Sequence, residues 1–264
     1  MRKKVKPVQA LTQAALDFGG SNTHSGVSTS RTLMLHELDA LLPTLPIDAS
    51  IAGYREAIVT GNVLLKPSAD ARIRTYGYLR DRFALDPNIG IFAVLRVLWD
   101  RDVAGRPLMA LLVAAFRDPL LRSTVPFVIE AEPGRPIASS DFASVISRAF
   151  PDRLGVKTLK ATSERMTATF RQSGHLLGRT HTVRQRVTPT PGSVALALLL
   201  ASLDGASGYA LFDTPWVSIL DGTPQQLLSE ARIASARGWL EIRQAGDVLD
   251  ISFHTLLSSI GRSS

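Results

Sequence analysis

The residues best suited to chemistry in this chain are cations gathered in one segment, residues 153–186. Eight lysines and arginines stand there against a single acid, Glu164, so the segment carries a local charge of +7. The eight are Arg153, Lys157, Lys160, Arg165, Arg171, Arg179, Arg184 and Arg186. Each phosphate neutralised by such a side chain releases a counterion, which makes binding strong and salt-sensitive. Arginine also contacts phosphates and guanine edges in bidentate fashion. The pattern predicts a nucleic-acid-binding surface.

The rest of the charge is distributed unevenly. The whole chain has a formal net charge of +7 and a pI of about 10.1. The first six residues add four further cations (Arg2, Lys3, Lys4 and Lys6). The remainder of the chain is therefore net acidic, and the basic character is concentrated in two places. A basic run can also be merely a solvated face, and that alternative stays open.

The elements expected around the cations resemble a winged helix-turn-helix unit. The apolar spacing predicts a helix over residues 157–173, ended by Gly174 in a left-handed cap. A return strand over residues 182–188 and a supporting helix over residues 141–150 complete the unit. In that arrangement the main helix enters the major groove and the hairpin contacts phosphates. Helix-plus-hairpin units also serve as dimerisation modules, which is the competing interpretation.

A second, smaller set of basic residues lies on an earlier predicted helix. Ser68 is placed to cap a helix over residues 69–84, on which apolar side chains recur at spacings of three and four. Arg72 and Arg74 lie off that apolar stripe, and we expect them to assist DNA binding.

The remaining pattern predicts a mainly α protein, with a helical bundle in the N-terminal half and a winged-helix-like C-terminal half with small β-hairpins. Further helices are expected over residues 29–42, 49–60, 193–203 and 224–237, with two more inside 88–121 and a hairpin over 239–253. The predicted division is a flexible basic arm (1–29), an N-terminal helical domain (30–132) and a C-terminal domain (137–264), separated by the turn cluster 133–136. The first segment can equally be a poorly ordered terminus without a role.

Composition excludes several classes of protein. The chain has 264 residues and no cysteine, so disulfides, thiolate metal sites and cysteine nucleophiles are ruled out. The longest apolar runs, residues 89–94 and 194–201, are far shorter than the roughly 20 residues of a membrane-spanning helix. No signal peptide is recognisable after the basic start. We therefore expect a cytoplasmic protein without a membrane partner.

No enzymatic constellation is recognisable either. The five histidines are scattered, and His175 and His181 have no acidic neighbour that would complete a metal site. Glycine-rich phosphate loops, dinucleotide fingerprints and nucleophile elbows are not found. We expect no catalytic residues, no metal, no cofactor and no small-molecule substrate.

Three stretches give the chain a family resemblance. Residues 56–85 read EAIVTGNVLLKPSADARIRTYGYLRDRFAL, residues 104–121 form an apolar helix pair ending in RDPLL, and residues 162–189 run from a helix through a Leu-Leu break to a basic segment closing in Val-Thr-Pro. In these features the chain resembles the BrxA family of BREX bacteriophage-exclusion systems. It departs from the family pattern in its longer C-terminal part, residues 209–264.

The resemblance implies a small helical accessory protein of an antiviral defence system, without enzymatic activity, that binds nucleic acid. Double-stranded DNA is the expected partner, with other phage-defence proteins as further partners. Two alternatives remain open: a scaffold subunit that makes no DNA contact, and an RNA-binding factor, since the family also resembles the helical antitermination factor NusB. The C-terminal helix and hairpin carry a balanced charge, which favours a packing or protein-contact role there.

Overall fold

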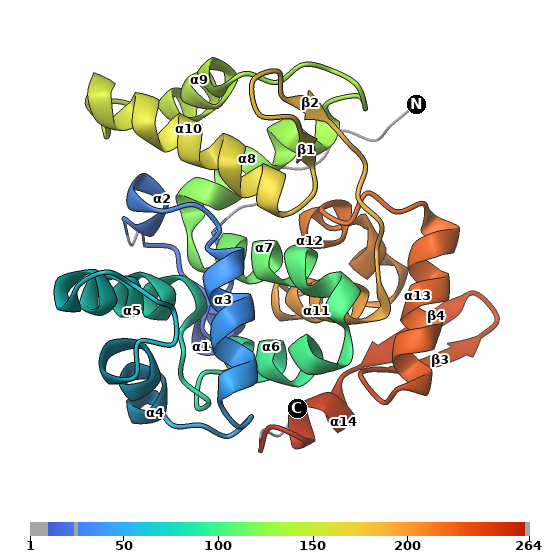
Figure 1. Cartoon of the computed structure of the whole chain (residues 1–264). Helices are drawn as coiled ribbons and strands as arrows, with labels where there is room; N and C mark the ends of the chain where they lie inside the picture. Colours follow the sequence, from blue (N-terminus) through green and yellow to red (C-terminus); the bar gives the residue numbers. More distant parts are fainter. Residues whose placement is uncertain (1–9, 24–25, 262–264) are drawn as a thin grey trace.

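The computed structural model describes residues 10–23 and 26–261. Within them the fold is mainly α, as predicted, with two small antiparallel hairpins (Figure 1). The helices are α1 (Gln13–Asp17), α2 (Val27–Ser30), α3 (Leu35–Leu41), η1 (Leu42–Thr44), α4 (Ile51–Arg55), the π-helix η2 (Glu56–Thr60), α5 (Ala69–Phe83), α6 (Gly90–Arg101), η3 (Val103–Gly105), α7 (Arg106–Arg117), α8 (Pro119–Glu130), α9 (Ser139–Ala149), α10 (Val156–Gln172), α11 (Pro191–Leu203), η4 (Gly208–Asp213), α12 (Pro215–Ser218), α13 (Pro224–Ala236) and α14 (His254–Ser258). The hairpins pair β1 (Leu176–Leu177) with β2 (Val183–Arg184), and β3 (Glu241–Ala245) with β4 (Val248–Ser252).

Local signals predicted several of these elements correctly. The Ser68 hydroxyl accepts a hydrogen bond from the Ala71 amide at 3.2 Å and caps α5. Thr223 caps α13 in the same way. Gly174 ends α10 with φ +85°, the left-handed conformation expected of it. The C-terminal hairpin also forms, and Ile242 pairs with Ile251 in its ladder.

Helix α11 lies at the centre of the molecule (Figure 1). Its residues from Gly192 to Ala201 are all buried, and they are apolar on every side apart from Ser193. A helix without a polar face must be covered all round. Here α6, α7, α12, α13 and α1 supply that cover.

The predicted boundary at residues 133–136 does not separate two cores. Helix α11, from the predicted C-terminal domain, packs on α6 and α7 from the predicted N-terminal one. One continuous apolar cluster runs from Leu11 to Leu256. Residues 30–132 and 137–264 thus share a core, because α11 is apolar on every side and its own half, through α12 and α13, covers only part of it, while α6 and α7 cover the rest.

The predicted flexible arm needs a correction as well. Residues 1–9, which hold its four cations, lie outside the described residues. Residues 10–23 pack on the core: Ala15 is fully buried, and the Arg117 Nη1 donates to the Gly19 carbonyl oxygen at 2.6 Å. These buried contacts explain why residues 10–23 pack on the core, whereas their polar composition had suggested a flexible segment.

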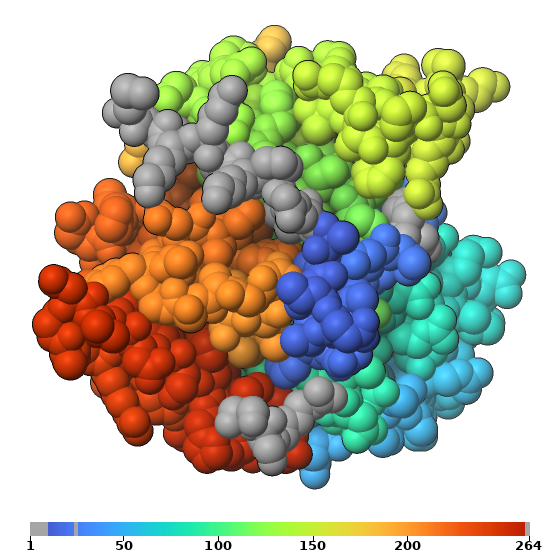
Figure 2. All heavy atoms as spheres, turned by 180° about the vertical axis from the view of Figure 1, so that it is seen from behind, coloured from blue at the N-terminus to red at the C-terminus, as the bar shows by residue number. Residues whose placement is uncertain are grey.

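The elements that carry the basic segment and pack against it form one end of the molecule. Helices α8, α9 and α10 and the β1–β2 hairpin lie together, at the top of Figure 1. Viewed from behind, the same region projects above the N-terminal and C-terminal parts (Figure 2). Helix α8 was not predicted, although Pro119 suits the first helical position, where no amide hydrogen is needed.

Candidate nucleic-acid interface

The end formed by α8, α9, α10 and β1–β2 has the order of elements of a winged helix. The segment between α8 and α9 is extended, and its Pro136 forms an antiparallel β-bridge with Val183. Val183 also pairs with Leu177, so β2 lies between β1 and the Pro136 segment. The Ile137 amide donates to the Thr182 carbonyl oxygen at 2.9 Å, and the Arg184 amide donates to that of Arg135, also at 2.9 Å. Two helices are thus followed by a small hairpin anchored to the segment before them.

Helix α10 presents one exposed stripe. Its inner face buries Thr162, Met166 and Phe170, and the Phe170 ring stacks on Phe142 of α9 with centroids 5.6 Å apart. At 100° per residue, Lys157, Lys160, Glu164 and Arg171 fall on the opposite side. The first three of these are exposed and Arg171 is half-buried.

A hollow of about 690 Å³ opens where this stripe meets the hairpin. It is lined by Pro136, Ile137, Ala138, Ser139, Glu164, Thr167, Arg171, Arg179, Thr180, His181, Thr182 and Val183. Three elements contribute: the segment entering α9, the C-terminal half of α10, and the loop between β1 and β2. The volume lies in the range of sites that hold a ligand group of several atoms.

Gly178 shapes the hairpin loop whose residues 179–182 line this hollow. Its φ is +99°, and a Cβ there would lie 2.1 Å from the His181 carbonyl oxygen, so no other residue fits without moving the backbone. The Arg171 Nη1 donates to the Gly178 carbonyl oxygen at 3.3 Å. The loop and α10 are thereby joined beside the hollow.

The structure brings four of the predicted cations to one surface. Lys157, Lys160 and Arg171 share the α10 stripe, and Arg179 lines the hollow together with Arg171. Among the described residues, none forms an ion pair or side-chain hydrogen bond with Lys157, Lys160 or Arg179. We call the set Lys157, Lys160, Glu164, Arg171 and Arg179 the α10–hairpin surface.

Three other predicted cations lie apart from it. The Arg165 Nη1 donates to the Thr29 carbonyl oxygen at 2.6 Å, which directs this half-buried side chain toward α2. Arg186 is exposed on the segment that leaves β2. Arg184 is buried, and its guanidinium binds the Asp221 carboxylate. This corrects the prediction for Arg184, because alternation in the short strand turns its side chain inward.

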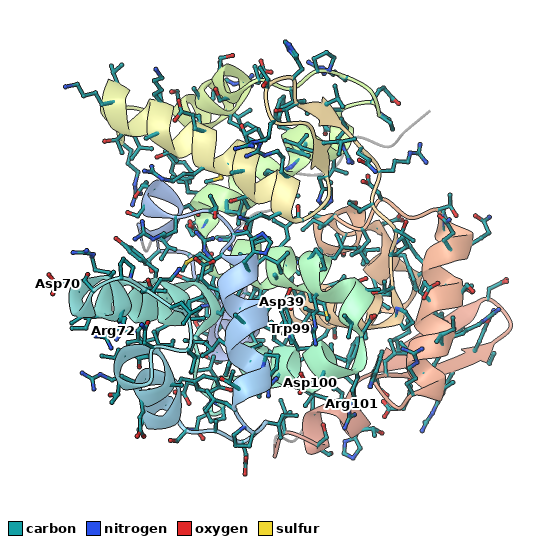
Figure 3. All side chains as sticks on the ribbon, in the orientation of Figure 1. Asp39, Asp70, Arg72, Trp99, Asp100 and Arg101 are labelled. Carbon is teal, nitrogen blue, oxygen red and sulfur yellow. The ribbon has the colours of Figure 1, made fainter. Side chains whose placement is uncertain are left out.

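Arg72 and Arg74 belong to a different part of the molecule. The half-buried Arg72 donates from Nη1 to the Val59 carbonyl oxygen at 3.0 Å and so ties α5 to η2. Figure 3 labels it beside α5, well below α10 in that view. Arg74 is exposed on α5. Because α2 packs between α5 and α10, these arginines are not part of the α10–hairpin surface.

A buried polar network holds the hairpin in place. The His175 Nε2 donates to the Ile219 carbonyl oxygen at 2.8 Å, and its Nδ1 faces the Ser173 hydroxyl at 2.8 Å. Burial lowers the pKa of His175 to about 4, although the nearby Asp221 acts in the opposite direction. His175 is therefore neutral near pH 7 and serves as a structural bridge to the C-terminal part.

Sequence reasoning missed the hydroxyl and backbone groups of the hollow, among them Ser139 and Thr180. It noted Glu164 only as the one acid in a basic segment. No spacing rule relates residues 137–139 to residues 179–182; only the bridge at Pro136 brings them together.

Within the described ranges, no group of three potential metal-ligating side chains occurs. No helix among the described residues has the length and apolarity to cross a membrane. No known family model matches this chain, and the search of curated proteins found no match.

Proposed function

We propose that this chain is a non-enzymatic protein that binds duplex DNA through the α10–hairpin surface. The observation that carries the proposal is the cationic stripe on an exposed helix, beside a hairpin loop that adds Arg179 at the same hollow. A helix exposed in this way has the diameter that the major groove of B-DNA admits. Arg171 and Arg179 flank the hollow at a position suited to a phosphate of one DNA strand.

The balance of charge supports an anionic partner. The surface has four cations against Glu164, and its cations are not used up by ion pairs with described residues. By contrast, other arginines of this chain are paired: Arg80 with Asp81, Arg96 with Asp100, and Arg106 with Asp39. Unpaired cations clustered on one surface are the electrostatic feature expected of a nucleic-acid-binding protein.

Fluorescence anisotropy with a labelled random-sequence duplex tests the proposal. The full chain is titrated at two salt concentrations, beside a variant carrying Lys160→Gln, Arg171→Gln and Arg179→Gln. Removing three phosphate contacts reduces the slope of log K against log salt by about 2 to 3. A control with Arg101→Gln, Arg232→Gln and Arg243→Gln removes the same charge from exposed positions elsewhere and keeps the slope. Equal slopes for the two triple variants would overturn the proposed surface.

A protein-contact role is the second candidate, favoured by apolar side chains exposed around α4 and α5. Leu65 is 87% exposed and Ile73 52%. Copurification with a partner, together with no retention of duplex DNA, would favour a scaffold over a DNA-binding protein. Competition by single-stranded RNA against the duplex tests the RNA-binding alternative.

The biological setting is proposed from the resemblance of residues 56–85, 104–121 and 162–189 to BrxA. We infer that the chain acts in the cytoplasm as an accessory protein of bacteriophage defence. Neighbouring genes for a large ATPase and an adenine methyltransferase would support this setting. A gene neighbourhood without defence functions would count against it.

A further inference from the structure

Glu164 is an unexpected residue in the centre of the α10–hairpin surface. It is exposed on the same stripe as Lys157 and Lys160 and also lines the hollow beside Arg171. Among the described residues, none forms an ion pair or hydrogen bond with its carboxylate. A carboxylate in this position repels phosphates and so lowers the affinity of the surface for any DNA. A specific contact that favours a carboxylate would offset that lower affinity.

From this position we propose that Glu164 reads a base in the major groove and selects cytosine. The inference rests on the proposed function and deepens it. An ionised carboxylate only accepts hydrogen bonds. On the major-groove edge, guanine presents the acceptors N7 and O6, and thymine presents the acceptor O4. Both bases therefore repel Glu164.

Cytosine and adenine each present an amino group, but their neighbouring atoms differ. Adenine places its N7 acceptor beside N6–H₂, which sets a second repulsion against the free carboxylate oxygen. Cytosine offers N4–H₂ with no acceptor on its own major-groove edge, the nearest being O6 of the paired guanine. Cytosine is thus the base whose major-groove edge best suits a single carboxylate. The cations around Glu164 bind the phosphate backbone of the DNA.

The neighbours of Glu164 on the helix fit this role. Ala161 and Ala168 lie about one turn before and after it on the outer side, and both have short side chains. A helix with small residues at these positions approaches base edges closely. The longer Lys157 lies about two turns before Glu164 and is exposed, and Arg171 lies about two turns after it, at the hollow.

In vitro selection from random duplexes tests the inference, with the wild-type chain, Glu164→Gln and Glu56→Gln. Glu56 is exposed on η2, so its substitution removes the same charge away from the surface. We expect wild type to enrich cytosine at one position, with a preference of about 5- to 150-fold, the range of a typical mismatch. Glutamine forms a bidentate pair with adenine N6 and N7, so Glu164→Gln shifts that position to adenine. Glu56→Gln keeps cytosine.

The possible outcomes distinguish a failure of base reading by Glu164 from a failure of DNA binding itself. If wild type binds duplexes but enriches no base, or if Glu164→Gln still enriches cytosine, the reading role is wrong and DNA binding stands. If wild type binds no duplex at all, the proposed function fails and the inference fails with it. Circular dichroism and thermal melting establish that each variant is folded.

Discussion

Arg184 and Asp221 form a buried ion pair that fastens the β1–β2 hairpin to the turn after α12. The Arg184 Nη2 lies 2.5 Å from one carboxylate oxygen of Asp221 and 2.7 Å from the other. The two side chains are 0% and 3% exposed. The Arg184 Nε also donates to the Val128 carbonyl oxygen of α8 at 2.7 Å. One guanidinium thus joins three parts of the chain.

Arg184→Met is expected to lower the free energy of unfolding by about 3 to 5 kcal/mol, because it leaves the Asp221 carboxylate buried without a counter-charge. Urea denaturation measures this loss. Arg179→Met, a change at an exposed arginine of the same hairpin, serves as the control and shifts stability by about 0.5 kcal/mol or less. Similar losses in the two variants would contradict the structural role of the pair.

The burial of His175 makes stability depend on pH. Its pKa falls from 6.5 to about 4 on folding, so the unfolded chain binds the proton more readily than the folded one. Stability is therefore full above about pH 6.5 and falls as the pH is lowered toward 4, by up to about 3 kcal/mol from this group.

Denaturation curves between pH 7 and pH 4.5 measure the effect. His175→Gln offers a hydrogen-bond donor and acceptor but does not titrate, so its stability changes less over the same range. An equally steep decline in this variant would assign the pH dependence to other groups.

Gly178→Ala tests the shape of the hairpin loop. The backbone at φ +99° and the approach to the His181 carbonyl oxygen force the loop to move, at a cost of about 1 to 2 kcal/mol. DNA affinity is expected to fall more than it does in Gly134→Ala. Gly134 also has a positive φ, +85°, but has open space where its Cβ would lie. Anisotropy titrations of both variants make the comparison, and equal affinities would contradict a role for the loop in binding.

Arg122 is expected to hold the N-terminal segment on the core. Its Nη1 donates to the Ala115 and Phe116 carbonyl oxygens, and its Nη2 donates to the Ser21 carbonyl oxygen and the Asn22 Oδ1, each at 3.1 Å. Arg122→Met removes these four hydrogen bonds. The Phe116 carbonyl oxygen still accepts from the Ser21 amide and the Asn22 Oδ1 from the Leu11 amide, but the Ala115 and Ser21 carbonyl oxygens lose this donor, at a cost of about 3 kcal/mol. Hydrogen exchange should then accelerate first in residues 10–22. Unchanged exchange there, with Arg101→Met as the exposed control, would show that the segment is held by other contacts.

The amino-acid sequence alone determined several helices of this protein, among them α5, α10, α11 and α13, and the location of its basic segment. Caps such as Ser68, stops such as Gly174 and the apolar spacing of residues 157–173 act between near neighbours, so a reader of the sequence can recognise them. The same locality made the grouping of Lys157, Lys160 and Arg171 predictable, because one helix carries all three.

Only the tertiary structure decided which cations are available to a partner. Arg184 and Arg186 are two residues apart, yet one is buried against Asp221 and the other is exposed, because the ion pair spans 37 positions of the chain. The hollow likewise depends on the bridge between Pro136 and Val183. Contacts of this kind arise from the packing of whole elements around α11, and no local spacing encodes them.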